Sequence, residues 1–209
     1  MDFQPLHYFF RGTGNPTAKT LLLLHGTGGN ERDFLILAED FGADLNILSL
    51  RGNVAENGMS RFFKRLGTGV FDERDLEFRT EEMIFFIKEL AVKEGFDSTK
   101  IIVLGYSNGA NIAGATLILH PDFFAGAILF RPMQPFRYIP NLKNKNNTPL
   151  FLSSGKNDPT VNTEETVEYI KILKNAHFRV SHYEMNTSHN LNQDDITLAV
   201  EWFKNNYKR

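Results

Sequence analysis

The sequence has 209 residues, of which 42% are hydrophobic and 23% charged, which suits one globular domain spanning residues 1–209 with a substantial core. Its formal net charge is -2, and acidic and basic residues are interspersed, which leaves no extended positive field to attract nucleic acid. It contains no cysteine, which excludes disulfides, thiolate metal sites and a cysteine nucleophile.

Residues 1–12 have no basic segment followed by an apolar stretch, so they do not match a secretory signal. Apolar runs such as residues 20–24 and 101–104 are far too short to span a bilayer. Together with the lack of cysteine, these features predict a cytoplasmic protein without a membrane segment.

Short apolar or β-branched runs alternate with longer segments of helical period, which predicts an α/β domain with a mostly parallel sheet. Several runs are apolar at consecutive positions, as in strands that helices cover on both faces. Strands are predicted at residues 7–11, 20–25, 46–50, 101–105, 125–130, 149–154 and 179–185. Helices are predicted at residues 32–40, 80–94, 108–120, 163–175 and 193–207. Residues 51–78 and 131–147 have no clear period, and long loops of this kind often bind ligands.

A Gly-Tyr-Ser-Asn-Gly pentapeptide occupies residues 105–109, at the end of one predicted strand and the start of a predicted helix. At such a turn the serine takes a strained backbone conformation that exposes its Oγ, and the glycines avoid collisions with neighbouring backbone. The pattern alone also occurs in glycine-rich turns with a solvated serine. Its position between strand and helix favours Ser107 as a nucleophile.

In proteins with this motif, an acidic residue and then a histidine follow the nucleophile along the chain, each in a loop after a later strand. Asp158 fits this order because it lies in a Gly-Lys-Asn-Asp-Pro segment directly after the predicted strand 149–154. The alternative interpretation is an ordinary Asp-Pro turn. Asp194 and Asp195 are weaker candidates because they begin the last predicted helix, where acidic side chains favour the helix dipole.

Three histidines follow this aspartate in the sequence. His177 lies near a helix end and His182 inside a predicted strand, whereas His189 lies in a polar loop. A general base must reach the serine with one ring nitrogen while the aspartate holds the other, and a loop position allows both. His189 is therefore the predicted base.

The segment 23–30, Leu-Leu-His-Gly-Thr-Gly-Gly-Asn, follows another predicted strand. Acyl transfer generates an oxyanion, which two preorganised backbone N–H donors stabilise by about 3 kcal/mol each. In this architecture the donors come from the residue after the nucleophile and from the loop after an early strand, which predicts Thr27 and Asn108. His25 is expected to shape this loop rather than to act as a base.

Two other site types do not match the sequence. The glycines at 26, 28 and 29 would complete a dinucleotide-binding G-x-G-x-x-G pattern only if glycine replaced Glu31. No phosphate-binding G-x-x-x-x-G-K-[ST] segment exists, and no helix carries two histidines at metal-ligand spacing. The predicted chemistry requires neither a metal nor an organic cofactor.

With these motifs the chain resembles the carboxylesterase/phospholipase branch of the α/β-hydrolases, which includes acyl-protein thioesterases, and within it a bacterial subgroup of predicted hydrolases described as carboxylesterases. The resemblance covers nearly the whole chain. It implies a mostly parallel sheet of about seven strands, flanked by helices on both faces, without a separate cap domain. It also implies Ser107, Asp158 and His189 as a catalytic triad. The segments that carry it are 24–30, 51–53, 61–63, 105–111, 155–159 and 188–189.

Two positions depart from the thioesterase-like members, which commonly have Gln after the nucleophile and Gly before the histidine. This chain has Asn108 and Ser188 there. Neither change removes a catalytic group, since Asn108 would act through its backbone. The absence of an inserted cap implies an open, shallow cleft for short acyl chains or small aromatic esters rather than long lipids.

Substrate contacts are expected from the two irregular stretches. Arg51, Arg61 and Phe62 are candidates in the first, where one arginine would select an anionic substrate. We favour the other interpretation, a solvated basic loop that aromatic residues anchor to the core. Met133 and Phe136, after the predicted strand 125–130, are candidates for a second wall.

The predicted function is hydrolysis of small or short-chain carboxylic esters through an acyl-enzyme intermediate. An acyl thioesterase or lysophospholipase would use the same catalytic groups. An alternative from a different class is a sensor that binds a small molecule at a retained hydrolase site. The expected partner is the ester substrate, and by base rate alone the commonest assembly is a homodimer.

Overall fold

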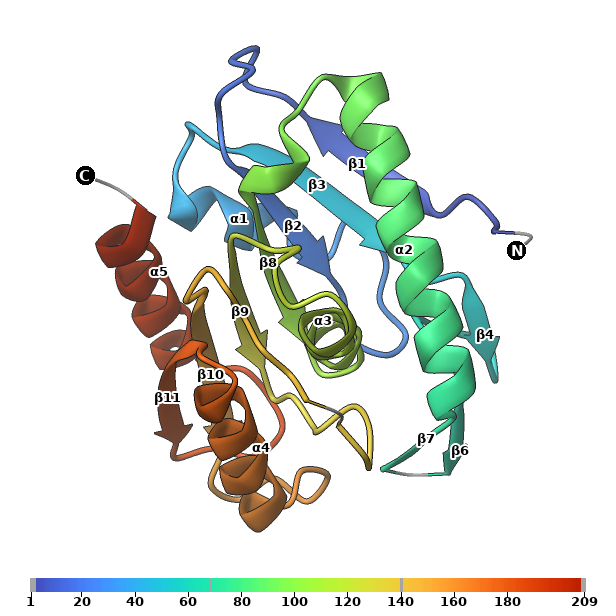
Figure 1. Cartoon of the computed structure of the whole chain (residues 1–209), viewed down its shortest axis with the longest axis vertical. Coiled ribbons are helices and arrows are strands. Elements are labelled where there is room, and N and C mark those ends of the chain that lie inside the picture. The colour runs from blue at the N-terminus through green and yellow to red at the C-terminus, as the bar shows by residue number, and fades with distance from the viewer. Residues whose placement is uncertain (1–2, 68, 140, 208–209) are drawn as a thin grey trace.

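A seven-stranded sheet forms the centre of the molecule in a computed structural model that describes residues 3–67, 69–139 and 141–207 (Figure 1). All seven strands agree to within one residue at each end with the strands predicted from the sequence. They are β1 (His7–Arg11), β2 (Thr20–Leu24), β3 (Asn46–Arg51), β8 (Ile101–Tyr106), β9 (Gly126–Phe130), β10 (Pro149–Gly155) and β11 (Arg179–Met185).

The strands are arranged in the order β1-β3-β2-β8-β9-β10-β11. The first strand of the chain runs antiparallel to β3, with His7 opposite Arg51, and every other neighbouring pair in this sheet is parallel. The inner strands β2 and β9 are buried along their whole length. This explains their consecutive apolar residues, because both faces of a parallel sheet are covered.

Five α-helices among the described residues surround this sheet (Figure 1). They are α1 (Leu35–Ala38), α2 (Glu73–Glu94), α3 (Asn108–Leu119), α4 (Thr163–Asn175) and α5 (Gln193–Tyr207). Buried side chains of α2, α3 and α4 share one core cluster, and those of α1 and α5 lie in a second cluster on the other face. The predicted α/β-hydrolase architecture is therefore confirmed. In the ranges described, no helix has the length and apolar character needed to cross a membrane.

Two helices differ from their predicted bounds by more than one residue. The helix expected at 80–94 begins seven residues earlier, because the Asp72 side chain accepts a hydrogen bond from the Asp75 backbone N–H and caps the first turn. The helix expected at 32–40 is a single α-helical turn, α1, followed by a 3₁₀ helix, Glu39–Phe41. Both differences arise at helix ends, where apolar periodicity carries little information.

The irregular stretch 51–78 contains two small antiparallel hairpins before α2. Their strands have two or three residues each, too few for an alternating pattern to be visible in the sequence. They are β4 (Val54–Glu56) paired with β5 (Met59–Arg61), and β6 (Arg65–Gly67) paired with β7 (Val70–Phe71).

The carboxyl ends of the parallel strands form one edge of the sheet. There β2 leads into the glycine-rich segment 25–29, β8 into Ser107, β10 into the segment with Asp158, and β11 into the loop with His189. In open α/β sheets ligands bind at this edge. The topology thus gathers four segments that are far apart in the sequence.

Candidate active site

Ser107 stands between β8 and α3 in a backbone conformation that L residues rarely adopt, with φ 52° and ψ -111°. Its backbone N–H donates to the carbonyl of Phe130, on the neighbouring strand, at 2.9 Å. Such strain persists only where surrounding structure enforces it, and it lifts the serine Oγ above the sheet edge.

The flanking glycines are required by close backbone approach. A Cβ at Gly105 would lie 2.6 Å from the backbone of Gly109, closer than real contacts allow. A Cβ at Gly109 would collide with the carbonyl of Leu24, at the end of β2. The turn therefore packs the first residues of α3 against the glycine-rich segment after β2.

The side chains of Ser107, His189 and Asp158 form one hydrogen-bonded row. His189 Nε2 lies 2.8 Å from Ser107 Oγ, and His189 Nδ1 lies 2.7 Å from Asp158 Oδ2. The aspartate side chain is almost fully buried, whereas the imidazole is about one-quarter exposed. Because a carboxylate can only accept, Nδ1 donates to Asp158 and Nε2 is left to accept the serine proton.

The second oxygen of this aspartate is also occupied. Asp158 Oδ1 accepts from the backbone N–H of Thr160 at 2.8 Å and from that of Val161 at 3.1 Å. These bonds form the Asp-Pro turn that was the alternative interpretation of this residue. One oxygen of the carboxylate therefore stabilises the turn, and the other contacts the imidazole.

The glycine-rich segment after β2 is held at both sides of Thr27. The Gly28 N–H donates to Ser60 O at 2.9 Å, and the Gly29 N–H donates to Gly26 O at 3.1 Å. The Thr27 hydroxyl accepts from Arg61 Nη1 at 2.7 Å. None of these bonds uses the Thr27 backbone N–H.

The other predicted donor, Asn108, is the first residue of α3. The N–H groups of a first helical turn have no partner within the helix and carry the positive end of its dipole. The side chain of Asn108 is buried, and its Oδ1 accepts from the Phe62 backbone N–H at 2.7 Å. This bond ties the nucleophile turn to the segment between the two small hairpins.

His25 has a structural position, as expected. Its Nδ1 donates to the Gly26 carbonyl at 2.6 Å, and its Nε2 accepts from the Gly52 N–H at 3.0 Å. The ring packs on Phe62 with 4.7 Å between ring centroids. Because Nε2 must stay unprotonated to accept, this arrangement requires a neutral imidazole.

Burial lowers the pKa of His25 below its ordinary value, although the Gly26 carbonyl opposes this. The unfolded chain therefore binds a proton near pH 6.5 that the folded chain does not, and unfolding becomes easier as the pH falls through this range. Burial also lowers the pKa of His182, with the same sign. We expect the free energy of unfolding in urea to decrease from pH 7.5 to 5.5, with each histidine adding at most about 1.4 kcal/mol per pH unit.

The variant His25→Asn tests this expectation. It should show a smaller pH dependence than the wild type, while the difference between the two at pH 8 reports the lost packing alone. Equal pH dependence in the two proteins would contradict a role for His25 protonation.

The two candidate arginines of the first irregular stretch face carboxylates. Arg51 forms a two-pronged pair with Glu31, which raises the pKa of the guanidinium and lowers that of the carboxyl. Arg61 is buried and pairs with Glu56 at 3.1 Å. Its guanidinium also donates to the Phe63 carbonyl and to the Thr27 hydroxyl, so it links β5 to the glycine-rich segment after β2.

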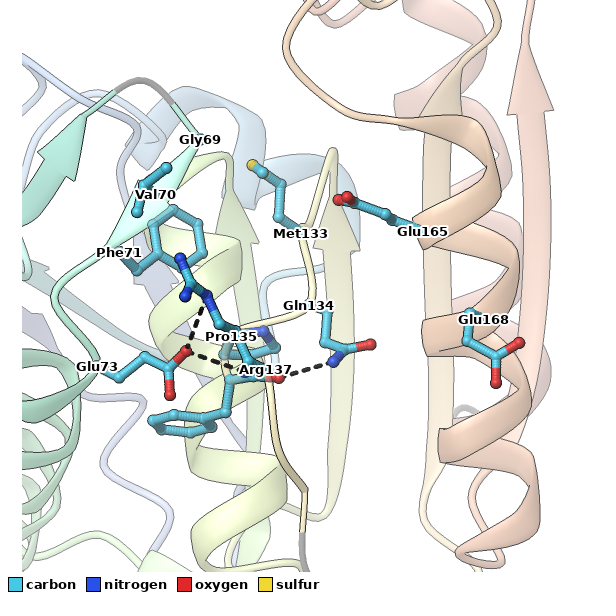
Figure 2. Close-up of a pocket in the computed structure, with 11 residues that line it drawn as sticks. Gly69, Val70, Phe71, Glu73, Met133, Gln134, Pro135, Arg137, Glu165 and Glu168 are labelled. Atoms are coloured by element: carbon cyan, nitrogen blue, oxygen red, sulfur yellow. Dashed lines mark hydrogen bonds and ion pairs between the residues drawn. The ribbon is translucent and has the colours of Figure 1, made fainter.

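A pocket of about 460 Å³ opens between the β6–β7 hairpin, the segment 133–137 and α4 (Figure 2). Met133 and Phe136 both line it, whereas Arg51, Arg61 and Phe62 do not. In Figure 2 the side chain of Glu165 extends from α4 toward Met133. The lining consists of Gly69, Val70, Phe71, Glu73, Met133, Gln134, Pro135, Phe136, Arg137, Glu165 and Glu168.

Two hydrogen bonds connect this pocket to the nucleophile. The Met133 N–H donates to Asn111 Oδ1 at 2.7 Å, and the Asn111 N–H donates to Ser107 O at 2.9 Å. Phe71 belongs to the irregular stretch 51–78, which was expected to contribute substrate contacts, and it lines this pocket. Glu165 could not be predicted, because it lies on the surface of α4, where neither local pattern nor spacing signals a pocket.

Comparison with known proteins agrees with this architecture. The model of the phospholipase/carboxylesterase family matches residues 67–206. The Bacillus subtilis (strain 168) protein named "Putative hydrolase MhqD" is 44% identical over 198 residues, which cover 95% of this chain and 97% of that protein. The crystal structure of the Bacillus cereus carboxylesterase superposes with a TM-score of 0.93 at 42% identity, covering 97% of this chain and 95% of that one.

A third similarity is partial. Acyl-protein thioesterase 1 of Candida albicans is 30% identical over 129 residues, which cover 57% of this chain and 55% of that protein. Thioesterases are thus found among the similar proteins, as well as a carboxylesterase.

Proposed function

Because the chain belongs to the phospholipase/carboxylesterase family and is a hydrolase of the carboxylesterase type, we propose that it cleaves small, neutral carboxylic esters with Ser107 as nucleophile. His189 acts as the general base, and Asp158 orients it. The observation that carries this proposal is the row of hydrogen bonds, 2.7 Å and 2.8 Å long, that joins the three side chains.

In the acylation half-reaction, His189 Nε2 takes the proton of Ser107 as the serine Oγ attacks the ester carbonyl. The developing oxyanion accepts hydrogen bonds from the backbone N–H groups of Thr27 and Asn108. When the intermediate collapses, the imidazolium gives its proton to the leaving alcohol. In deacylation His189 activates water in the same way, and the acid is released.

The pocket beside Met133 supports a small substrate group. Its volume lies at the lower end of the range that small-molecule sites occupy. Its lining includes one cation, Arg137, and three acidic residues, Glu73, Glu165 and Glu168. This excess of negative charge disfavours anionic substrates. The guanidiniums of Arg51 and Arg61 already face carboxylates, which argues against the anionic-substrate interpretation of those residues.

A panel of p-nitrophenyl esters tests the substrate class. We expect kcat/KM to be highest for acetyl to butyryl groups, to fall at least about tenfold for octanoyl, and to fall similarly for the negatively charged hemisuccinate ester. Matched butyryl thioesters distinguish the thioesterase alternative that the Candida albicans relative raises. A preference for octanoyl or for thioesters would reject the proposed substrate class while leaving the catalytic groups in place.

A further inference from the structure

Arg131, the first residue after β9, is fully buried and has a positive φ of 55°. An arginine side chain has five N–H donors, and all five are used. The guanidinium donates from Nη1 to Ser153 Oγ at 2.7 Å and to Asp195 Oδ1 at 2.8 Å, and from Nη2 to Asp195 Oδ2 at 2.7 Å. It also donates from Nε to the Ser188 carbonyl at 3.3 Å and from Nη2 to the Asn190 carbonyl at 3.0 Å.

These two carbonyls flank His189 in the sequence. The carbonyl of His189 itself accepts from the Tyr106 hydroxyl at 3.2 Å. Side chains therefore bind three consecutive backbone carbonyls of the loop. Arg131 donates to two of them, and Tyr106, which precedes the nucleophile, donates to the third. The loop lies between the end of β11 and the start of α5, so neither strand nor helix pairing fixes this part of its backbone.

Asp195 extends the same network to the far end of the loop. Its Oδ2 accepts from the Asn192 N–H at 3.0 Å, and its own N–H donates to Asn192 Oδ1 at 3.0 Å. These reciprocal bonds resemble a capping box at the start of α5. The weaker acidic candidate from the sequence thus belongs to this ion pair, whereas Asp158 contacts the imidazole.

A buried ion pair is a weak source of stability, because desolvation of the two charges offsets most of their attraction. Apolar residues of similar volume would fill the same space. What apolar residues cannot supply is a rigid fork of donors that binds two carbonyls on either side of one residue. The contacts of Arg131 therefore indicate that it fixes the geometry of the loop backbone rather than adding to the stability of the fold.

We propose that Arg131, held by Asp195, is a positioning residue for His189. By fixing the carbonyls of Ser188 and Asn190, it keeps the imidazole Nε2 at hydrogen-bond distance from Ser107. This inference rests on the proposed role of His189 as the general base. Since the side-chain hydrogen bonds of Arg131 go to Ser153, Asp195 and the loop, none of which lines the pocket, its loss should affect the chemical step and leave substrate binding unchanged.

The double variant Arg131→Met/Asp195→Leu tests the proposal without leaving an unpaired buried charge. We expect kcat for p-nitrophenyl acetate to fall about 10²-fold, as for a catalytic group displaced by about 1 Å, with KM changed less than about twofold. Covalent labelling of Ser107 by a fluorophosphonate should slow by a similar factor. A folded double variant with wild-type kcat and labelling rate would overturn the proposal.

The single variant Arg131→Lys keeps the question decidable if the double variant does not fold. Its ammonium retains the charge beside Asp195, but its three donors lack the planar fork that reaches both loop carbonyls. We expect kcat to fall about tenfold with KM nearly unchanged. Wild-type kcat in this variant would also overturn the proposal.

The matched control is Tyr207→Phe. This change removes a partly buried side-chain donor to a backbone carbonyl, that of Ala125 at 2.9 Å, at the opposite end of β9. It should lower the melting temperature and leave kcat unchanged. Ser107→Ala separates the two proposals, because a kcat near the wild-type value in that variant rejects the proposed function, whereas unaltered kcat in the Arg131 variants rejects the positioning role alone.

Discussion

Ser107→Ala is expected to lower kcat for p-nitrophenyl acetate by about 10⁶-fold, the loss seen when the nucleophile of a serine hydrolase is removed. The variant keeps the proposed backbone N–H donors of Thr27 and Asn108, so about 10³- to 10⁴-fold acceleration over the reaction in water remains. The methyl group fits the turn, because Cβ is already present at this position and the change leaves the close backbone approach at Gly105 and Gly109 unaltered.

The chain offers a matched control in a second serine–histidine pair. Ser154 Oγ lies 2.8 Å from His182 Nε2, the same distance as in the proposed catalytic pair. Ser154 lies within β10 rather than at a strand-to-helix turn, and no carboxylate hydrogen-bonds the other nitrogen of His182 in the described residues. Ser154→Ala should therefore retain wild-type kcat. Equal losses in the two variants would contradict the assignment of Ser107.

The central sheet could be predicted because its signal is local. Consecutive apolar residues in β2 and β9 report strands covered on both faces, and this burial pattern is what the structure contains. The start of α2 could not be predicted from periodicity, since its first turn is fixed by the side chain of Asp72 and not by apolar spacing. The two hairpins in 51–78 are too short to carry any pattern.

The same distinction applies to the candidate site. The turn at Ser107 is defined by five adjacent residues, and chain order narrowed the choice of Asp158 and His189. The position of Arg131 depends instead on Asp195, 64 residues away, and nothing in the local sequence relates the two. The partner of Arg51, Glu31, lies twenty residues upstream, so the local sequence does not reveal this ion pair. The basic charge of Arg51 suggested a contact with substrate, and the ion pair argues against that contact.

Asp158→Asn should lower kcat about 10⁴-fold while leaving the local structure intact. The asparagine Oδ1 can still accept from the backbone N–H groups of Thr160 and Val161, which preserves the turn. Its Nδ2 then faces His189 Nδ1 as a donor, in the place where Asp158 Oδ2 accepts at 2.7 Å. The imidazole must accept at Nδ1 and carry its proton on Nε2, so it can no longer take the proton of Ser107.

Steady-state kinetics and thermal unfolding of this variant are needed together, because the expected result is a lower kcat in a protein that is still folded. The control is Asp97→Asn, since Asp97 Oδ1 accepts from the Thr99 N–H at 2.9 Å in the same kind of turn, remote from the histidine loop. That variant should keep wild-type kcat. The kcat of Asp158→Asn could instead remain within about tenfold of the wild-type value. In that case the aspartate does not determine which ring nitrogen of His189 carries the proton, and the row of hydrogen bonds does not perform the proposed proton transfer.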